Sequence, residues 1–360
     1  PRNRWTWPAW QPGICWAEGR EARSRLADPG FMRAFLTGAS GFVGGHLLRA
    51  LEERGRDVVC LVRRGSDRRN LVGTRAAVVE GDLTQPDSFQ PELRTCTEVY
   101  HCAADYRLFV RRPDAMYAAN VGGTRAVMEA AADAAVERIV YTSSVGALGL
   151  RADGGPGDEE TPVALSDMVG HYKKSKYLAE RAAEEWVERG LPVVIVNPST
   201  PVGEADLKPT PTGRMIVDFL RRKTPAYVDT GLNLVDVRDV AVGHVLAAER
   251  GRIGQKYILG HENLSLANIF ELLSGLTGLR APGLRLPHAV PIAFARLDTA
   301  RARLFGGEPR VALEAALLAR YKMYFSAGKA VRELGLPQTP VRQALARAVG
   351  WFHDNGYAER

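Results

Sequence analysis

A glycine-rich turn near the start of the chain constrains its fold more than any other feature. Gly38, Gly41 and Gly44 follow an apolar run that begins at Met32, and an amphipathic stretch over 42–54 comes next. Because glycine has no Cβ, this spacing allows a tight strand-to-helix turn and lets an anion approach the first turn of the helix. We predict that the turn binds a dinucleotide pyrophosphate, with a turn that binds no ligand as the alternative. The predicted contact residues are Gly38, Ser40, Gly41, Phe42, Val43 and Gly44.

Strand-like and helix-like segments alternate after this turn. The apolar runs predicted as strands are 57–63, 77–80, 98–102, 138–143 and 193–197, and the predicted helices are 42–54, 115–135 and 167–189. Strands separated by helices imply right-handed crossovers and a parallel sheet. The predicted class is therefore α/β, a Rossmann-type doubly wound parallel sheet with a smaller C-terminal substrate-binding lobe.

Three regions follow from this pattern. Residues 1–31 hold four of the six tryptophans without helical or strand periodicity, so we predict an upstream, disordered extension and expect Met32 to be the natural start. An aromatic arm that touches a membrane is the alternative. Residues 32–200 are predicted to form the NAD(P)-binding domain. Residues 201–355 are predicted to form mostly the substrate lobe, with 232–260 returning to the first domain.

Tyr172 and Lys176 lie four residues apart in a predicted helix, which puts the phenol and the ammonium group on one face. A cation at ~4 Å stabilises a phenolate by about 4 kcal/mol at an effective dielectric of ~20, enough to lower a phenol pKa from about 10 to about 7. We therefore expect Tyr172 to be a catalytic acid/base whose pKa Lys176 keeps low. The alternative is an exposed face of a lysine-rich helix.

The end of the second predicted strand indicates which nicotinamide cofactor is bound. In NAD-binding proteins a carboxylate about 20 residues after the glycine turn binds the ribose diol. Val62 takes that position here, and Arg63, Arg64, Arg68 and Arg69 follow it. Since guanidinium groups suit a 2′-phosphate, we predict NADP contacted by Arg63, with NAD as the alternative. A solvated arginine loop without a ligand is the other interpretation.

Composition argues against several other classes of protein. The formal charge of +7 comes without a basic run or an interleaved aromatic platform, so we predict no nucleic-acid partner; an anionic substrate or membrane surface suits the charge better. No apolar stretch is long enough to cross a bilayer. The cysteines have neither disulfide nor metal-ligand spacing, so we predict reduced thiols, a cytoplasmic protein and no metal site. They are Cys15, Cys60, Cys96 and Cys102.

Six short motifs follow one another along the chain in a recognisable order. They are the glycine turn, Gly81-Asp82-Leu83, His101-Cys102-Ala103-Ala104, Asn120-Val121-Gly122-Gly123-Thr124, Tyr141-Thr142-Ser143-Ser144 and the Tyr172/Lys176 pair. This ordered set resembles the extended short-chain dehydrogenase/reductases, over almost the whole chain from Met32. Within them the chain is similar to the dihydroflavonol 4-reductase-like branch of the NAD-dependent epimerase/dehydratase family. The segments that begin at Ala104, Asp167 and Asn197 most resemble the bacterial hopanoid-associated sugar epimerases.

The resemblance also implies roles for individual residues. The implied cofactor contacts are Asp82 and Leu83 beside the adenine, Ala103 and Ala104 near the ribose, and Pro198 and Ser199 at the nicotinamide. Ser144 matches the catalytic hydroxyl of the family, with Ser143 as the alternative. Asn120 matches a helix asparagine that supports the hydrogen bonds of the active site. We count Asn120, Tyr172 and Lys176 with the residues of the cofactor site.

The predicted chemistry is hydride transfer. Ser144 would hydrogen-bond the substrate oxygen, Tyr172 would exchange its proton, and Lys176 would also hold the ribose hydroxyls of the cofactor. Relatives that dehydrate sugar nucleotides have an acidic pair after the catalytic hydroxyl, whereas this chain has Val145 and Gly146, so a dehydratase is disfavoured. An epimerase acting on a sugar or sugar nucleotide in hopanoid lipid modification and an NADPH-dependent carbonyl reductase both fit. A non-catalytic NADP-sensing regulator and a membrane scaffold are alternatives of another class.

The substrate site is the least determined part of the prediction. Tyr106, Arg107, Lys208 and Arg214 are the candidates to contact a small-molecule substrate, and packing explains each of them equally well. The resemblance implies a homodimer, in which 115–135 and 167–189 form a four-helix seam. Peripheral contact with a membrane is the other expected association.

Overall fold

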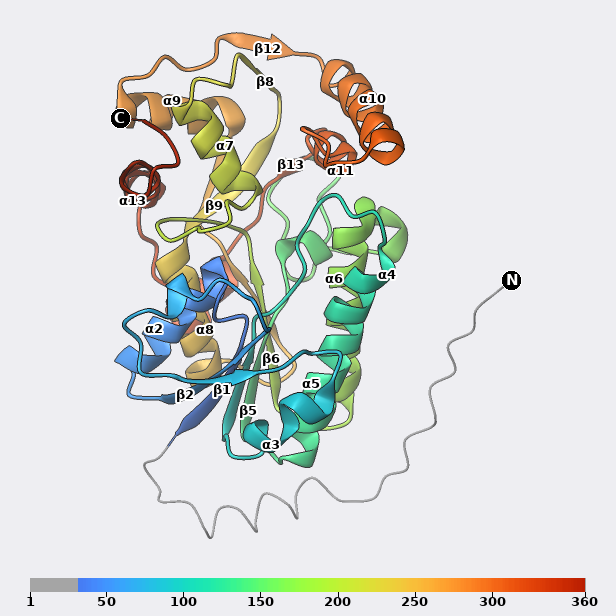
Figure 1. The fold of residues 1–360 in the computed structure, drawn as a ribbon, viewed down its shortest axis with the longest axis vertical. Coiled ribbons are helices and arrows are strands. Elements are labelled where there is room, and N and C mark those ends of the chain that lie inside the picture. The colour runs from blue at the N-terminus through green and yellow to red at the C-terminus, as the bar shows by residue number, and fades with distance from the viewer. Residues whose placement is uncertain (1–31, 360) are drawn as a thin grey trace, which may run out of the picture.

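The computed structural model describes residues 32–359, and its centre is a seven-stranded parallel sheet (Figure 1). The strands are β1 (Arg33–Thr37), β2 (Asp57–Val62), β3 (Ala77–Glu80), β4 (Glu98–His101), β5 (Arg138–Thr142), β6 (Val193–Pro198) and β10 (Lys256–Leu259). Their order is β10-β6-β5-β4-β1-β2-β3. The direction of winding reverses between β1 and β4, so the carboxyl ends of these two strands flank the crevice where such sheets bind ligands.

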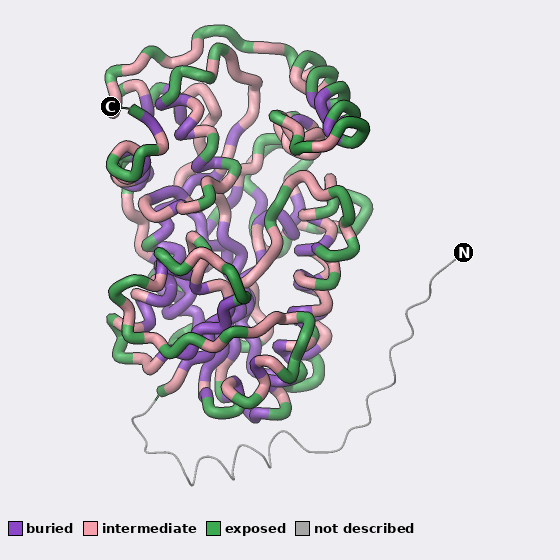
Figure 2. The backbone as a smooth tube through the Cα atoms, viewed as in Figure 1, coloured by how far each residue is buried: buried purple, intermediate pink, exposed green. Residues whose placement is uncertain are grey.

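Helices cover both faces of this sheet. On one face lie α2 (Phe42–Glu53), α8 (Val237–Arg250) and α12 (Gly328–Leu334), and on the other α3 (Gln90–Leu93), α5 (Gly123–Asp133) and α6 (Gly170–Glu188). Figure 2 shows the central strands as the most continuously buried part of the molecule. Burial on both faces explains why the strands inside the sheet are nearly uninterrupted apolar runs in the sequence, whereas the edge strand β3 is largely exposed. The predicted doubly wound α/β fold is confirmed.

A smaller mixed sheet lies beyond the carboxyl end of the large one. In it β9 (Gly231–Asp236) pairs with β7 (Thr200–Val202), β11 (Glu262–Ser265) and β13 (Lys322–Met323). Strands β8 (Ala226–Val228) and β12 (Leu284–Leu286) form a separate two-stranded sheet. Three helices share an apolar cluster with the mixed sheet: α7 (Pro211–Leu220), α9 (Leu266–Thr277) and α13 (Val341–Asp354). Two further helices, α10 (Ala289–Phe305) and α11 (Leu313–Leu318), lie above α6 in Figure 1.

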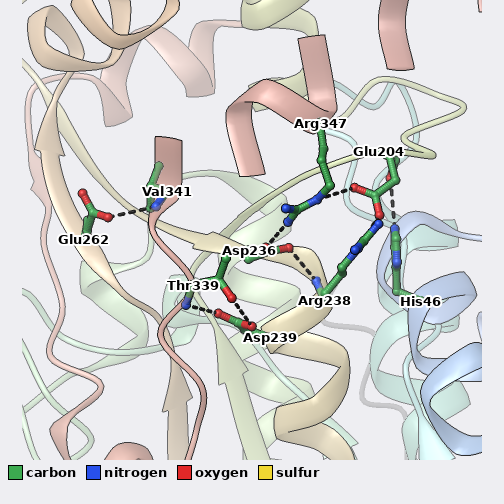
Figure 3. Close-up of polar contacts among 9 residues, drawn as sticks. All are labelled: His46, Glu204, Asp236, Arg238, Asp239, Glu262, Thr339, Val341 and Arg347. Carbon is green, nitrogen blue, oxygen red and sulfur yellow. Dashed lines mark hydrogen bonds and ion pairs between the residues drawn. The ribbon is translucent and has the colours of Figure 1, made fainter. Parts of the chain in front are cut away.

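A polar network holds α2, α8 and α13 together (Figure 3). The Glu204 carboxylate accepts hydrogen bonds from Arg238 at 2.6 Å and from Arg347 at 3.1 Å. The Glu204 carbonyl oxygen lies 3.0 Å from the His46 ring nitrogen. Arg347 also forms an ion pair with Asp236, which is almost completely buried at the end of β9. The two sheets are therefore connected by charged groups as well as by the chain.

The elements differ from the predicted ones in three places. The helix predicted over 115–135 consists of α4 (Asp114–Tyr117), a π-helical turn (Ala118–Gly122) and α5. The helix predicted from 167 begins at Gly170. The short strands of the smaller sheet occupy a region predicted to be loops and short helices, because runs of two to six residues give little periodicity.

The predicted domain boundaries stay a prediction. The segment 232–260, expected to return to the first domain, contains β10, which belongs to the large sheet, and α8, which packs on that sheet. The predicted extension over 1–31 lies outside the described residues. Within 32–359, no helix combines the length and the apolar character needed to cross a membrane.

Candidate active site

The glycine turn joins β1 to α2 with little room for side chains. Gly38 has φ +82°, and a Cβ on it would lie 2.7 Å from the Ala103 backbone nitrogen. A Cβ on Gly44 would lie 2.1 Å from the Gly38 carbonyl oxygen. Gly41, in contrast, is exposed and directly precedes the first residue of α2, Phe42. The turn therefore presents an uncovered helix N-terminus, which is the arrangement that a pyrophosphate requires.

The carboxyl ends of β1 and β4 are held together by a buried hydrogen-bonded chain. The Thr37 hydroxyl lies 2.8 Å from His101 Nδ1 and accepts a hydrogen bond from the Ala103 backbone NH at 3.1 Å. His101 Nε2 lies 3.1 Å from the Thr124 hydroxyl of α5. Burial lowers the pKa of His101 to about 3, so its ring is neutral. The hydrogen-bonded chain places Ala103 and Ala104 beside the glycine turn. The sequence analysis did not assign His101 or Thr124 a part in this arrangement.

The arginines after β2 divide into two pairs. Arg68 forms an ion pair with Glu80, and Arg69 forms one with Asp67 at 2.7 Å. Across residues 32–359, the exposed side chains of Arg63 and Arg64 form no ion pair. Two guanidinium groups without an ion pair among the described residues therefore remain at the end of β2, where the ribose of a bound dinucleotide would lie.

Asp82 and Leu83 follow β3 close to this cationic region. The Asp82 carboxylate accepts hydrogen bonds from the Thr84 backbone NH at 2.8 Å and from its hydroxyl at 2.7 Å. These bonds, and to a lesser degree the charge of Arg63, lower the Asp82 pKa. Leu83 packs in the apolar layer beneath α5. Both residues are partly exposed, as a contact with an adenine requires.

Two hydroxyl groups meet at the end of β5. The Ser144 side chain hydrogen-bonds Tyr172 and also accepts from the Gly146 backbone NH at 3.0 Å. Both side chains remain partly exposed. Ser143 is 5% exposed, and its hydroxyl has no partner among the described residues. The geometry therefore favours Ser144 over Ser143 as the hydroxyl that works with Tyr172.

Lys176 lies on the same face of α6 but does not lower the Tyr172 pKa as expected. Removal of water from around the phenol raises the pKa of Tyr172, and the Ser144 hydrogen bond opposes that only in part. The Lys176 ammonium group donates to the Thr142 carbonyl oxygen at 2.7 Å. Burial lowers the pKa of Lys176 itself to about 8. The expectation is wrong for the protein alone, because the cation is directed at the end of β5 and desolvation of the phenol dominates.

Asn120 supports α6, the helix that carries Tyr172, through hydrogen bonds to its side. It lies in the π-helical turn, 3% exposed, and its amide NH₂ donates to the Ser175 hydroxyl and the Asp105 carbonyl oxygen, both at 2.9 Å. Its amide oxygen accepts from the Asp105 backbone NH at 2.7 Å. Ser175 in turn donates to the Tyr172 carbonyl oxygen at 2.8 Å. Since both amide hydrogens are used within the protein, Asn120 positions Tyr172; a contact with the cofactor stays a prediction.

Pro198 and Ser199 lie at the end of β6, next to β10. The Ser199 backbone NH donates to the Leu259 carbonyl oxygen at 3.0 Å. The Ser199 hydroxyl is buried and has no hydrogen-bond partner within residues 32–359. An unpaired buried hydroxyl at this position fits the carboxamide of a nicotinamide, and the glycine turn fits the pyrophosphate. The residues present therefore suit a nicotinamide dinucleotide.

A buried ionic cluster beneath the site was missed from the sequence. Glu180, one turn after Lys176 on α6, is fully buried and lies 2.7 Å from the Lys256 ammonium group. Its other oxygen accepts from the Asn197 side chain at 2.7 Å. Asn197 also donates to the Ser144 carbonyl oxygen at 3.1 Å. The helical spacing of Tyr172, Lys176 and Glu180 was the available signal.

The substrate candidates are dispersed over the mouth of the site. Tyr106 is 43% exposed, and Arg107 ion-pairs with Asp105 of its own loop at 2.5 Å. Lys208 is exposed and lies close enough to Asp67 to help lower the pKa of that carboxyl, after the larger effect of the Arg69 hydrogen bonds. Arg214 is exposed on α7. Lys208 is therefore a neighbour of the arginine loop as much as of a substrate site. Among the described residues, no three His, Cys, Asp or Glu side chains are grouped to hold a metal ion.

Comparison with known proteins identifies the family. The model of the NAD dependent epimerase/dehydratase family matches residues 34–260. A Synechocystis sp. protein named "Putative dihydroflavonol 4-reductase" is 46% identical over 329 residues, covering 90% of this chain and 96% of the relative. "Sterol demethylase protein B" of Methylococcus capsulatus is 34% identical over 327 residues, covering 90% of this chain and 99% of the relative.

A solved structure agrees with this assignment. The crystal structure of gox2253 matches with a TM-score of 0.82 and 49% identity, covering 91% of this chain and 99% of that one. The predicted resemblance to the dihydroflavonol reductase-like proteins is confirmed. The chain belongs to the NAD-dependent epimerase/dehydratase family, and it is an NAD(P)-dependent oxidoreductase of the extended short-chain dehydrogenase/reductase type.

Proposed function

We propose that the protein transfers a hydride between NADP(H) and a secondary alcohol or ketone, with Tyr172 as the acid/base. The observation that carries the proposal is the pair of hydrogen-bonded hydroxyls, Ser144 and Tyr172, at the end of β5 beside the glycine turn. Ser144 would donate to the substrate oxygen while Tyr172 gives or takes its proton. Lys176, buried below them, would bind the ribose hydroxyls. The bound nicotinamide supplies the hydride acceptor or donor.

NADP is the proposed cofactor, and NAD is the alternative. The two guanidinium groups without ion pairs, Arg63 and Arg64, support this choice because a 2′-phosphate would compensate their charge. The proposed contacts are otherwise those expected from the sequence, from the glycine turn to Ser199. An exchangeable NADP(H) suits a reductase, which must renew its cofactor at each turnover.

Reduction of a ketone is the reaction that the geometry supports best. Val145 and Gly146 are buried where a dehydratase would need acidic side chains, which agrees with a reaction at one carbon only. The sterol named for the Methylococcus relative favours a polycyclic lipid substrate, and a lipid of the hopanoid class is consistent with it. The second candidate is epimerisation of a sugar or sugar nucleotide, favoured by the matching family model.

We also propose a cytoplasmic homodimer. The sequence predicts a seam formed by α5 and α6, and these helices lie side by side with an exposed Arg125–Glu185 ion pair between them. Light scattering of the purified protein tests this assembly: a mass of one chain would reject it.

Calorimetric titration with NADP and NAD tests the cofactor, and Arg63→Ala is the informative variant. A preference for NADP that is lost in the variant is expected. Turnover is tested by following oxidation of NADPH with a 3-ketosteroid and, separately, with UDP-glucose. NADPH consumption with the ketosteroid, abolished by Tyr172→Phe, supports the reductase. Interconversion of the sugar nucleotide without net cofactor consumption supports the epimerase, and tight binding without any turnover supports a regulator.

A further inference from the structure

Helix α10 carries its large apolar side chains on the outside. Leu297, Leu304 and Phe305 are 74%, 78% and 84% exposed, and Val290 and Phe294 are about half exposed. The spacing of 290, 294, 297 and 304 puts these positions in one stripe along the helix. Figure 1 places α10 at the periphery, and Figure 2 shows its outer surface as exposed and its inner surface as buried.

The side of α10 that faces the protein is small or polar. Its buried residues are Ala295, Asp298, Thr299 and Ala302. A helix on a globular protein normally buries its large apolar stripe and exposes its polar residues. An outward apolar stripe costs free energy unless another body covers it.

Specific hydrogen bonds fix this orientation of α10. Arg111, in the loop after β4, donates to the carbonyl oxygens of Ala302 and Gly307, both at 3.2 Å. Asp298 of α10 accepts hydrogen bonds from the backbone NH groups of Arg310 and Val311 in the connection to α11, the second at 3.4 Å. These hydrogen bonds attach the C-terminal half of α10 and the connection to α11 to the rest of the protein. The helix is therefore not free to rotate about its axis and bury its apolar stripe.

The charges beside the stripe are positive. Arg296 and Arg303 are exposed, and within residues 32–359 their side chains form no ion pair. The acidic residue of α10, Asp298, has only 7% of its side chain exposed. Apolar side chains flanked by arginines are the pattern of a helix that lies in the headgroup region of an anionic bilayer. Pairing with a second copy would instead add the same uncompensated arginines from both partners to one contact.

The stripe belongs to the part of the molecule that adjoins the catalytic helix. Helix α10 packs on α11, and the Glu314 carboxylate of α11 accepts from the His171 backbone NH at 2.9 Å. His171 directly precedes Tyr172 on α6. The stripe is therefore connected through α11 to the first turn of α6, the helix that carries Tyr172.

We propose that α10 is a membrane-docking helix, which inserts its apolar stripe into an anionic lipid surface while Arg296 and Arg303 contact the headgroups. The proposal concerns the docking surface and does not depend on the direction of the redox reaction. Docking through α10 differs from a general attraction between the +7 charge of the chain and an anionic membrane, because it requires the apolar side chains of the stripe.

Sedimentation of the full chain with phosphatidylcholine/phosphatidylglycerol vesicles tests this proposal, with pure phosphatidylcholine vesicles in parallel. The wild type is expected to bind the anionic vesicles and to be released by high salt. Leu297→Ser should weaken binding about tenfold, since one buried leucine is lost. Arg296→Glu/Arg303→Glu should weaken it at least as much. Val72→Ser is the matched control, because Val72 is also 74% exposed but lies outside α10.

Three results would overturn the proposal. The wild type could bind neither kind of vesicle. Leu297→Ser could bind as well as the Val72→Ser control, which would assign any binding to another part of the chain, including residues 1–31, since every variant retains them. Light scattering could reveal an oligomer that Leu297→Ser dissociates without any vesicle binding, which would make a second copy the occupant of the stripe. Thermal unfolding of each variant shows that the exposed substitutions leave the fold intact.

Discussion

Replacing Lys256 by methionine should destabilise the protein far more than its place at the rim of the sheet suggests. The Lys256 ammonium group lies 2.7 Å from Glu180 and 2.8 Å from Glu184, and Glu180 is fully buried. Although desolvation lowers the pKa of Lys256, the two carboxylates raise it overall. Methionine keeps most of the side-chain volume but removes the charge, so the partners left to Glu180 within residues 32–359 are Asn197 and Arg181.

The size of the effect follows from the contact. Two unit charges 2.7 Å apart attract by about 6 kcal/mol at an effective dielectric of ~20. Desolvation of both groups offsets part of this attraction in the native protein, but that offset does not disappear when a single partner is removed. Leaving one buried charge without its partner costs about 3–5 kcal/mol. We expect a loss near 3 kcal/mol in the free energy of unfolding, because the Asn197 hydrogen bond to Glu180 remains.

A double-mutant cycle measures the interaction directly. Lys256→Met, Glu180→Gln and the double variant are unfolded in urea, and the double variant should lose about 2 kcal/mol less than the sum of the two single losses. Arg252→Met is the control, since it removes a cation from an exposed pair with Glu333 and should cost far less than Lys256→Met. A Lys256→Met loss no larger than that of the control, or strict additivity in the cycle, would refute this account of the cluster.

Three more predictions concern single side chains. Burial raises the Asp206 pKa to about 6, so the stability that protonated Asp206 contributes is full below its unfolded pKa of 3.8 and is lost as pH rises through 6. Asp206→Asn should therefore become more stabilising as pH rises, with an advantage in urea unfolding that grows by about 2 kcal/mol between pH 4 and 7. A flat difference would contradict it. Gly44→Ala should weaken NADP binding in calorimetry by more than about tenfold, because its Cβ would meet the Gly38 carbonyl; unchanged affinity would show that the turn adapts. Arg347→Leu should cost about 3 kcal/mol of unfolding free energy by leaving the buried Asp236 without its guanidinium partner, and a loss below about 1 kcal/mol in urea unfolding would reject that role.

Sequence periodicity was a good guide where both faces of an element are buried. Six of the seven strands of the large sheet and the helix after the glycine turn were predicted within one or two residues, because each belongs to an apolar or amphipathic run. The seventh strand, β10, was not predicted as a strand. The smaller sheet was not predicted. Its strand β7 has three residues and β13 has two, and their pairing with β9 depends on contacts between segments far apart in the chain.

The spatial arrangement of the candidate site residues was predicted only where local sequence spacing determines it. Local spacing is enough to put Tyr172 and Lys176 on one face of α6 and to bring Ser144 to the end of a strand. The Glu180–Lys256 contact joins residues that are distant in the sequence, so no local pattern contains it. The direction in which the Tyr172 pKa shifts could not be predicted from the sequence either, since it depends on how much water the fold removes from around the phenol.

That raised pKa bears on the direction of the proposed reaction. A phenol that holds its proton at neutral pH is ready to donate it to a ketone oxygen, as reduction requires. Oxidation of an alcohol requires the phenolate, and the Ser144 hydrogen bond only partly offsets the desolvation that opposes it. An epimerase must perform both an oxidation and a reduction at Tyr172, so its phenolate would need further stabilisation, for example from the positive charge of the oxidised cofactor. A reductase needs only the protonated form that the protein already favours, and we therefore rank ketone reduction above epimerisation.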